Sequence, residues 1–292
     1  MNSKPNLLFV HAHPDDETIV TGATMAKYAA EGCGVTLITC TAGEEGEVLV
    51  PDLAHLAAGQ NDELGPERKV ELANAMAELG VTDFDFLGGF GTYRDSGMIG
   101  TEPNENPQSF WQADLLEAAN HVVKVIRDRR PQVLVTYDEF GGYGHPDHIQ
   151  AHRVAMYAAA LAAAPSYLPE IPIWSVPKIY WIASPRERAR AQFAQLMEMG
   201  IDIGMDLDEI SAMPYFCDDE LVTTAIDGSA HADKKAAALR AHKTQIDMES
   251  GFLAAIGQLG NQATGLEHFR LVGGSKFQHL STLSETDLLA GL

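Results

Sequence analysis

The chain has 292 residues, 46% of them hydrophobic, and its 41 Asp and Glu against 20 Lys and Arg give a formal charge of −21. Such a charge repels nucleic-acid phosphates and anionic lipid, so we expect a small-molecule substrate and neither nucleic acid nor membrane as a partner. Because the three cysteines show no CxxC spacing and no apolar run approaches a membrane span, we expect a globular, cytoplasmic protein without a disulfide framework.

Strand and helix patterns alternate through the first part of the chain. An apolar run at 7–10 predicts a buried strand, the stretch 17–32 a helix that ends on Gly, and 35–40 a second strand. The alternation continues with helices expected at 66–80, 113–130 and 148–164 and strands at 84–87 and 133–137. Strands separated by helices predict an α/β fold, a Rossmann-like, mostly parallel sheet with helices on both faces.

Four prolines between 165 and 177 mark a break in this pattern. Beyond it, strands are expected at 178–183 and 221–226, and helices from Pro185 to about Met199 and from about Ala232 to His242. We expect a Rossmann-like core over 1–170 and a smaller C-terminal α/β lobe over 171–292 packed on it. The final ~45 residues show no pattern that predicts an element.

Two clusters of titratable residues follow predicted strands. HAHPDDE at 11–17 comes after the first strand, and its two histidines leave an extended segment on the same side. DEFGGYGHPDH at 138–148 holds the same position after the strand at 133–137. Open α/β sheets bind ligands outside the carboxyl ends of their strands, so we expect the two loops to meet there.

The residue types in these clusters suit a metal. A catalytic zinc typically takes three ligands from His, Asp or Glu and keeps a fourth position for water. His13, Asp16 and His148 would supply such a set, which suits Zn²⁺ and also Fe²⁺. A lone histidine near a helix start is more often a surface or core residue, but the pair of motifs HPDD and HPDH favours a metal site.

HAHPDDE together with GGYGHPDH resembles the zinc-dependent PIG-L/LmbE-like deacetylase family. TAGEEGEV at 41–48, YRDSGM at 93–98, AHKTQ at 241–245 and the ending ETDLLAGL are similar to its mycothiol-pathway branch. The resemblance implies a zinc-dependent amidohydrolase. Its expected reaction removes the N-acetyl group from N-acetylglucosaminyl-myo-inositol, a pseudodisaccharide, in mycothiol biosynthesis.

Amide hydrolysis needs an activated water, a polarised carbonyl and a proton for the departing nitrogen. We expect Asp15 to accept the proton of the water, and His145 to act as general acid or as a cation that stabilises the oxyanion. Asp147 would orient the His145 imidazole and raise its pKa. Tyr143, in a glycine-rich loop, would donate a hydrogen bond to the oxyanion. The alternatives are helix capping for the two acids and a covering role for the tyrosine.

A sugar linked to inositol calls for charged hydrogen-bonding groups in the pocket. The family resemblance favours Arg68, Asp95 and Glu47 as substrate-binding residues, all in segments expected at the ligand end of the sheet. Gln245 is expected to reach the site from the C-terminal lobe. By position alone, Arg68, Asp95 and Glu47 could each instead be a solvated loop charge.

Two other functions stay open from the sequence. A mycothiol S-conjugate amidase would share the metal site, but such relatives typically carry Lys in place of Val20 and Pro in place of Gly144, so both positions favour the deacetylase. A non-catalytic, metal-dependent sugar-binding protein would be expected to lack Asp15 or His145, and both are present. The sequence names neither the native metal nor the oligomeric state.

Overall fold

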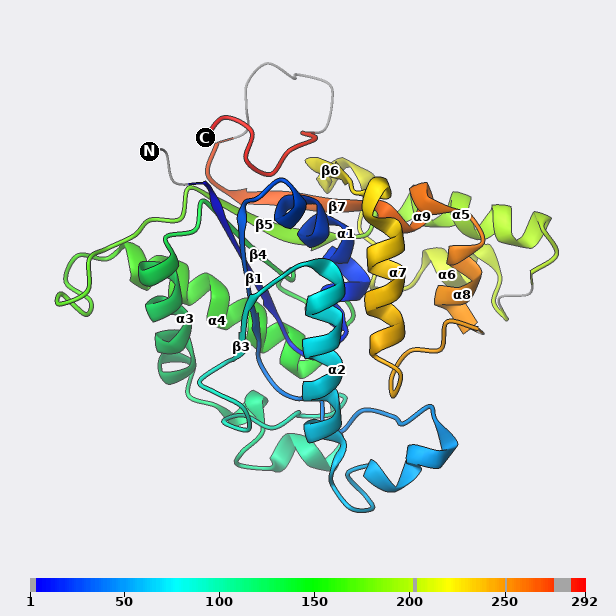
Figure 1. Cartoon of the computed structure of the whole chain (residues 1–292), viewed down its shortest axis with the longest axis horizontal. Helices are drawn as coiled ribbons and strands as arrows, with labels where there is room; N and C mark the ends of the chain where they lie inside the picture. Colours follow the sequence, from blue (N-terminus) through cyan, green and yellow to red (C-terminus); the bar gives the residue numbers. More distant parts are fainter. Residues whose placement is uncertain (1–3, 202–203, 250, 276–284) are drawn as a thin grey trace.

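The computed structural model describes residues 4–201, 204–249, 251–275 and 285–292, and within them one sheet has the strand order β3-β2-β1-β4-β5-β7-β6 (Figure 1). The strands are β1 (Asn6–His11), β2 (Gly34–Thr39), β3 (Asp83–Phe86), β4 (Val133–Thr136), β5 (Lys178–Ala183), β6 (Thr224–Asp227) and β7 (Leu266–Gly273). Neighbours from β3 to β5 pair in parallel, whereas β7 is antiparallel to both β5 and β6.

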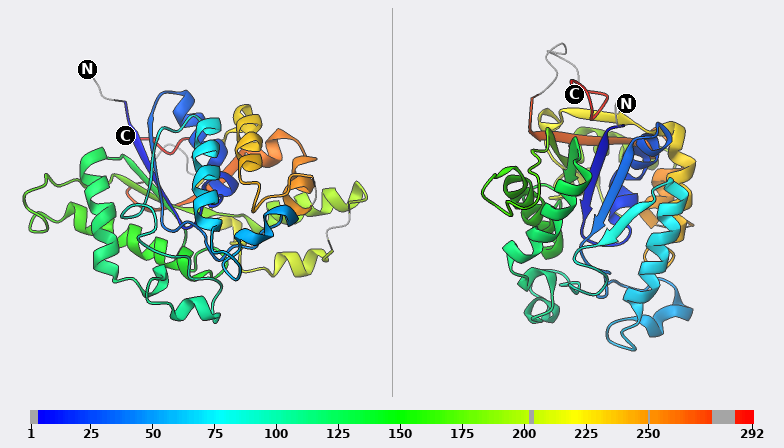
Figure 2. Two further views of the ribbon diagram at one scale, coloured as in Figure 1. Left: turned by 60° about the horizontal axis from the view of Figure 1, so that its bottom comes forward. Right: turned by 60° about the vertical axis from the view of Figure 1, so that its left-hand side comes forward.

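Helices cover both faces of this sheet (Figures 1 and 2). They are α1 (Asp16–Ala30), α2 (Leu64–Leu79), α3 (Leu115–Arg129), α4 (Pro146–Ala163), α5 (Arg186–Glu198), α6 (Leu207–Ser211), α7 (Ala232–Ala241), α8 (Gly251–Gly257) and α9 (Asn261–Gly265). Leu7 and Phe9 of β1 join the core beneath α1, α2 and α7, while Leu8 and Val10 join the core beneath α3 and α4. Because both of its faces are covered, β1 is apolar without alternation.

The Rossmann-like prediction is confirmed, and the predicted elements lie within a few residues of the observed ones. The strand at 178–183 coincides with β5, and the helix expected at 148–164 begins two residues earlier, at Pro146. The strand β7, for which no element was predicted, lies between β5 and β6. Residues beyond 170 therefore extend the same sheet, and the boundary between 170 and 171 stays a prediction.

The sheet reverses its strand order between β1 and β4. From β1 the chain passes through α1 to β2 and β3 on one side, and then returns to place β4 on the other side. The loops after β1 and β4 diverge at this point and leave a crevice at the carboxyl ends of the strands. Both predicted clusters stand there. None of the helices in the described ranges is both long and apolar enough to cross a membrane.

Candidate active site

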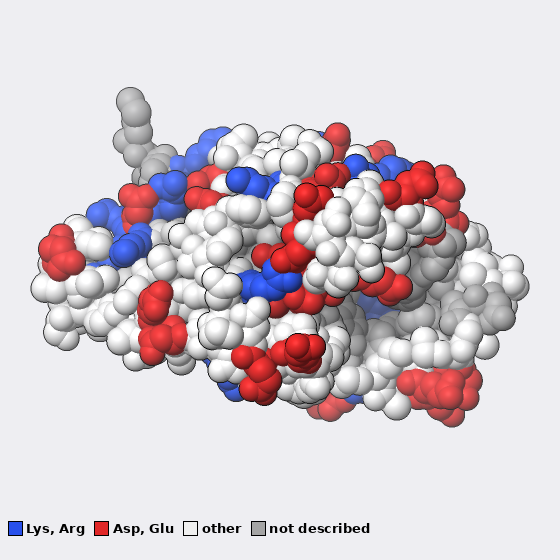
Figure 3. All heavy atoms as spheres, turned by 90° about the horizontal axis from the view of Figure 1, so that it is seen from below, with Lys and Arg blue, Asp and Glu red and all other residues white. Residues whose placement is uncertain are grey.

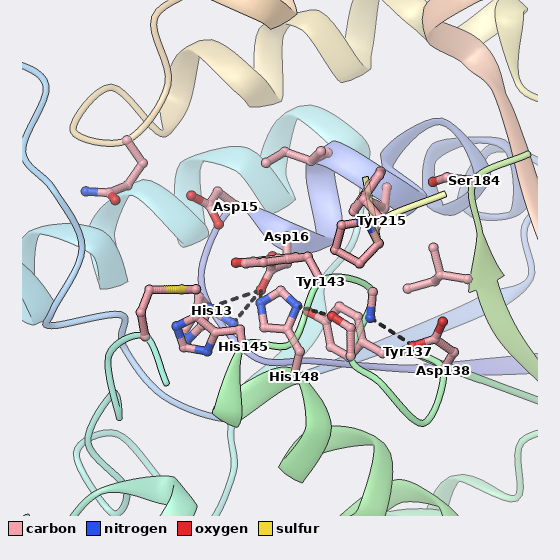
Figure 4. A pocket seen from close by; sticks show the side chains of 18 of the residues that line it. His13, Asp15, Asp16, Tyr137, Asp138, Tyr143, His145, His148, Ser184 and Tyr215 are labelled. Carbon is pink, nitrogen blue, oxygen red and sulfur yellow. Dashed lines mark hydrogen bonds and ion pairs between the residues drawn. The ribbon is translucent and has the colours of Figure 1, made fainter. Parts of the chain in front are cut away.

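A cavity of about 670 Å³ opens at this crevice, and the side chains of both clusters line it (Figure 4). Its walls include His13, Asp15, Asp16, Tyr143, His145 and His148. Figure 3 views the molecule from the side toward which β1 runs, and acidic side chains are spread over this face. The prediction that the two loops meet at the strand ends is confirmed.

Asp16 lies between two imidazole rings. Its Oδ2 atom is 3.4 Å from Nδ1 of His13 and 3.3 Å from Nε2 of His148, and it accepts the backbone N–H of His13 at 2.9 Å. Ligand atoms that surround a tetrahedral zinc at its usual distance of about 2.0 to 2.1 Å stand roughly 3.4 Å apart. The carboxylate oxygen therefore stands at ligand spacing from both ring nitrogens.

The hydrogen bonds of His13 leave its Nδ1 atom free to bind a metal. Nε2 of His13 lies 3.1 Å from Oδ2 of Asp147, a carboxylate that also accepts the backbone N–H and the hydroxyl of Ser96. A carboxylate that takes the Nε2 proton fixes the tautomer in which Nδ1 carries a lone pair. The carboxylate of Asp147 therefore contacts His13, and the prediction that this carboxylate orients His145 is wrong.

His145 and His148 are held in opposite tautomers. Nδ1 of His148 lies 3.2 Å from the carbonyl of Gly141, so Nδ1 carries the proton, and the buried Nε2 is left without a hydrogen-bond partner among the described residues. In contrast, Nδ1 of His145 accepts the backbone N–H of Asp147 at 3.1 Å and caps α4, so the neutral ring carries its proton on Nε2. His148 thus offers a metal a lone pair, and His145 offers the cavity a donor.

Two further groups of side chains could also hold a metal. His13, His145 and His148 can place one nitrogen each within 4.8 Å of one another, and His13, Asp95 and Asp147 do the same with their ligand atoms. The first group needs His145 to give up the tautomer that its cap imposes. The second needs Asp147 to release Ser96 and His13. The set with Asp16 requires neither change, although its three ligand atoms do not all lie within 4.8 Å of one another.

The carboxylates around His13 favour a positive charge on its imidazole ring. Burial lowers the pKa of His13, but Asp95, Asp147 and Asp16 outweigh it and raise the pKa well above its usual range. Burial lowers the pKa of His145 to about 3, helped by His13 and His148, so this ring is neutral. The expectation that Asp147 raises the pKa of His145 is therefore wrong, because its carboxylate lies against His13, and burial outweighs the raising effect of Asp95 and Asp16.

Asp15 enters the cavity from a left-handed backbone conformation. It stands at the N-cap of α1 with φ 118° and ψ −36°, and its side chain makes no capping hydrogen bond. Such a conformation costs about 1 to 3 kcal/mol in a residue other than glycine. The carboxylate lies 3.2 Å from Nη2 of Arg68, yet burial raises the pKa of Asp15 to about 6 despite this cation. A carboxyl group with such a pKa suits proton transfer.

Tyrosines flank the proposed ligand His148 on two sides. The ring of Tyr143, 39% exposed, meets it edge-on with centroids 5.0 Å apart, and burial followed by Asp16 and Asp15 raises the phenol pKa well above its ordinary value. Tyr137 stacks on His148 at 4.3 Å, and its hydroxyl accepts the backbone N–H of Ala12. The sequence analysis missed Tyr137; its place at the end of a predicted strand, just before the second cluster, was the available signal.

The four predicted substrate-binding residues differ in their placement. Arg68 and Gln245 line the cavity. Asp95 is buried behind it, where Oδ1 lies 3.7 Å from Nε2 of His13 and accepts the N–H of Gly97. Glu47 is exposed outside the lining, and its neighbour Glu45 lies in the cavity wall instead. Contact of these four residues with a substrate stays a prediction.

Comparison with known proteins identifies the family. The family model described as PIG-L: GlcNAc-PI de-N-acetylase matches residues 8–159, about half of the chain. A protein of Catenulispora acidiphila named 1D-myo-inositol 2-acetamido-2-deoxy-α-D-glucopyranoside deacetylase 1 is 57% identical over 98% of this chain and 89% of its own length. The chain belongs to the PIG-L family. A protein from a Nocardioides species, which has the same deacetylase name without the final numeral, is 55% identical over the full length of both chains.

Solved structures show how widely this PIG-L fold is shared. The N,N'-diacetylchitobiose deacetylase from Pyrococcus horikoshii is similar with a TM-score of 0.62 at 20% identity, over 92% of this chain and 84% of that one. The 4-carboxy-2-hydroxymuconate hydratase from Pseudomonas putida is similar with a TM-score of 0.59 at 19% identity, over 95% and 100%. Since a hydratase shares the fold, the reaction must be argued from the side chains of the site.

Proposed function

We propose that this protein hydrolyses the N-acetyl group of 1D-myo-inositol 2-acetamido-2-deoxy-α-D-glucopyranoside with a divalent metal held by His13, Asp16 and His148. The observation that carries the proposal is the position of the Asp16 carboxylate, 3.4 Å and 3.3 Å from ring nitrogens whose lone pairs are free. The names of relatives at 57% and 55% identity supply the substrate.

We propose zinc as the metal, with Fe²⁺ as the alternative that the same donors accept. Such an ion fits the buried Nε2 of His148, which makes no hydrogen bond with the described residues, and the ligand spacing around Asp16. When bound, a divalent metal polarises an amide carbonyl and lowers the pKa of a water molecule. The remaining steps fall to the side chains of the cavity.

Asp15 is positioned to accept the proton of the attacking water. It lies next to the proposed ligand Asp16 in the sequence, and its carboxylate lines the cavity. The bond to Arg68 orients this carboxylate while burial keeps its pKa near 6. A base of that kind holds a proton transiently and can pass it on.

His145 and Tyr143 supply donors for the developing oxyanion and the leaving amine. The cap of α4 keeps the His145 proton on Nε2, so the neutral ring donates without a net charge. Tyr143 follows Gly141 and Gly142, both at positive φ, in a loop that can adjust to bring the phenol to the oxyanion. Asp147 acts behind the site and keeps His13 in its ligand tautomer.

The same loop favours the deacetylase over the conjugate amidase. Gly144 has φ +90°, and a Cβ atom built there lies 3.0 Å from Cζ of Phe140. Proline is locked near −65°, so an amidase-type GGYPHPDH loop cannot take this conformation. Val20 also lines the cavity, where the amidase relatives place a lysine.

Residues of the C-terminal half support the proposed division of labour between 1–170 and 171–292. Ser184, Tyr215 and Gln245 line the cavity from beyond β4, which supports a second part that completes the substrate pocket of the first. The substrate contacts are assigned to Arg68 and Gln245, which line the cavity, and to Asp95 and Glu47, which do not. A cytoplasmic location is proposed from the three free cysteines.

The test uses protein stripped of metal and reconstituted with Zn²⁺, or with Fe²⁺ under anaerobic conditions. Release of free amine is measured on the N-acetylglucosaminyl-inositol and on a bimane conjugate of mycothiol. The expected result is a kcat/KM at least tenfold higher for the first substrate. The reverse preference would identify the amidase, and tight metal binding without hydrolysis of either substrate would indicate a binding protein.

A further inference from the structure

The strained backbone of Asp15 is held by a buried carboxylate. The N–H of Asp15 donates to Oε2 of Glu17 at 3.0 Å, which is the hydrogen bond that the structure gives this amide. The carbonyl of Asp15 starts α1 by accepting the N–H groups of Thr18 and Ile19. The side chain of Glu17, in the first turn of α1, therefore binds the backbone N–H of Asp15 two residues before it.

Glu17 is itself fixed by a residue from the far end of the sequence. Its Oε1 atom accepts the Thr18 hydroxyl at 2.6 Å and lies 3.1 Å from Nε2 of His242, and both Glu17 and His242 are fully buried. His242 follows α7 and belongs to the AHKTQ segment at 241–245. His242, 225 positions from Glu17 in the sequence, is thus linked through Glu17 to the backbone N–H of Asp15.

Packing alone does not explain this pair. A buried carboxylate and imidazole pay a desolvation cost that an apolar pair of the same volume avoids. The two oxygens of Glu17 are divided between different tasks, one on His242 and Thr18 and the other on the Asp15 amide. An apolar side chain could fill the space but could not hold that amide.

We propose that Glu17 and His242 are positioning residues that keep Asp15 in the backbone conformation from which its carboxylate enters the cavity. The inference rests on the proposed function, in which Asp15 accepts the proton of the water. It also assigns a role to AHKTQ, because this segment connects α7 of the C-terminal half to the catalytic loop.

The experiment is a double-mutant cycle on the metal-loaded protein. Glu17→Ala is expected to lower kcat by about 10 to 100-fold with KM and metal content unchanged, since a shift of a reacting group by about 1 Å has that effect. In an Asp15→Ala background, Glu17→Ala is expected to cause no further loss, because it acts through Asp15. An equal loss in both backgrounds would overturn the inference.

The second arm keeps the test informative if Glu17→Ala folds poorly. His242→Gln places an amide where Nε2 stood and is expected to retain most of kcat, whereas His242→Leu lacks the donor and is expected to lower kcat at least tenfold. Equal activity of these two variants would contradict a role through Glu17. A fully active Asp15→Ala variant would instead refute the proposed function of Asp15.

Glu71 provides the matched control. It is another buried glutamate, on α2, and its two oxygens accept the N–H and the hydroxyl of Thr244, two residues after His242. It docks the same segment beside Gln245 without a contact to Asp15. Glu71→Gln is expected to change KM more than kcat, and a kcat loss equal to that of Glu17→Ala would show that docking of the segment, not the Asp15 amide, is what matters.

Discussion

The carboxylate of Asp147 holds the Nε2 atom of His13 at 3.1 Å, although the two residues are 134 positions apart. The same carboxylate is anchored by the amide and hydroxyl of Ser96 in the loop after β3. A carboxylate behind a metal-binding histidine fixes its tautomer and strengthens it as a ligand. Three chain segments therefore determine how one proposed ligand is presented.

Asp147→Asn is expected to weaken metal binding by about 10 to 100-fold, because the neutral amide supports the His13 ligand less well. Ser96→Ala, which leaves the carboxylate charged but less firmly anchored, is expected to have a smaller effect. Competition with a chelator of known affinity measures both. Wild-type affinity in Asp147→Asn would show that this contact does not tune the site.

Each of His13→Ala, Asp16→Ala and His148→Ala is expected to lose bound metal, since three ligands leave no redundancy. Metal content after gel filtration, measured by atomic emission, checks this. His145→Ala serves as the control and is expected to keep the metal while losing activity. Loss of metal in His145→Ala together with full occupancy in Asp16→Ala would instead assign the site to the three histidines.

Asp15→Asn is expected to keep the metal and the substrate affinity but to lower kcat by about 10² to 10⁴-fold, the usual contribution of a general base. Steady-state kinetics and metal content of the same preparation are compared. If the variant lost metal instead, Asp15 would be a ligand, and the division of roles between Asp15 and Asp16 would be reversed.

Tyr143→Phe is expected to lower kcat and kcat/KM together, by about tenfold, because the phenol donates mainly in the transition state and its exposure lets water substitute in part. Burial raises the pKa of this phenol, so it stays a protonated donor up to at least about pH 10. If wild-type activity declines between about pH 8 and 10, the activity of Tyr143→Phe must therefore decline over the same range. If Tyr143→Phe were fully active and Tyr143→Ala impaired, Tyr143 would cover the pocket and would not donate to the oxyanion.

Arg127 is expected to matter for stability and not for chemistry. It is 2% exposed, and its guanidinium donates to five backbone carbonyls at and beyond the end of α4. Arg127→Met removes these five charge-assisted hydrogen bonds, although the carbonyls of Leu161, Ala162, Ala164 and Leu168 keep a backbone N–H donor. It is expected to cost about 2 to 3 kcal/mol, with Arg127→Lys intermediate. Urea denaturation measures the change. A stability within about 0.5 kcal/mol of wild type would contradict the assignment.

The sequence predicted those features of the site that follow from the order and direction of the strands. Parallel strands end at one edge, so clusters after β1 and β4 had to approach each other, and H-x-x-D spacing predicted that His13 and Asp16 share a site. The partner of Asp147 could not be predicted in this way. Its direction depends on Ser96, a loop residue whose position is set by tertiary packing alone.

The strand β7 escaped prediction for a related reason. Charged residues interrupt its pattern, and one of them, Glu267, is buried because its carboxylate accepts the N–H groups of Ala23 and Thr24 and pairs with Lys235. In a sequence, a charged residue of a buried ion pair cannot be distinguished from a charged residue that faces solvent. Its burial becomes visible only when α1 and α7 are placed against the sheet.

Anomalous diffraction from crystals of the zinc-loaded protein tests the central claim most directly. The predicted result is one strong peak, about 2.0 to 2.2 Å from Nδ1 of His13, an oxygen of Asp16 and Nε2 of His148, with His145 outside the coordination shell. A peak bound by Nε2 of His145 in place of Asp16, or one held between Asp95 and Asp147, would contradict the account.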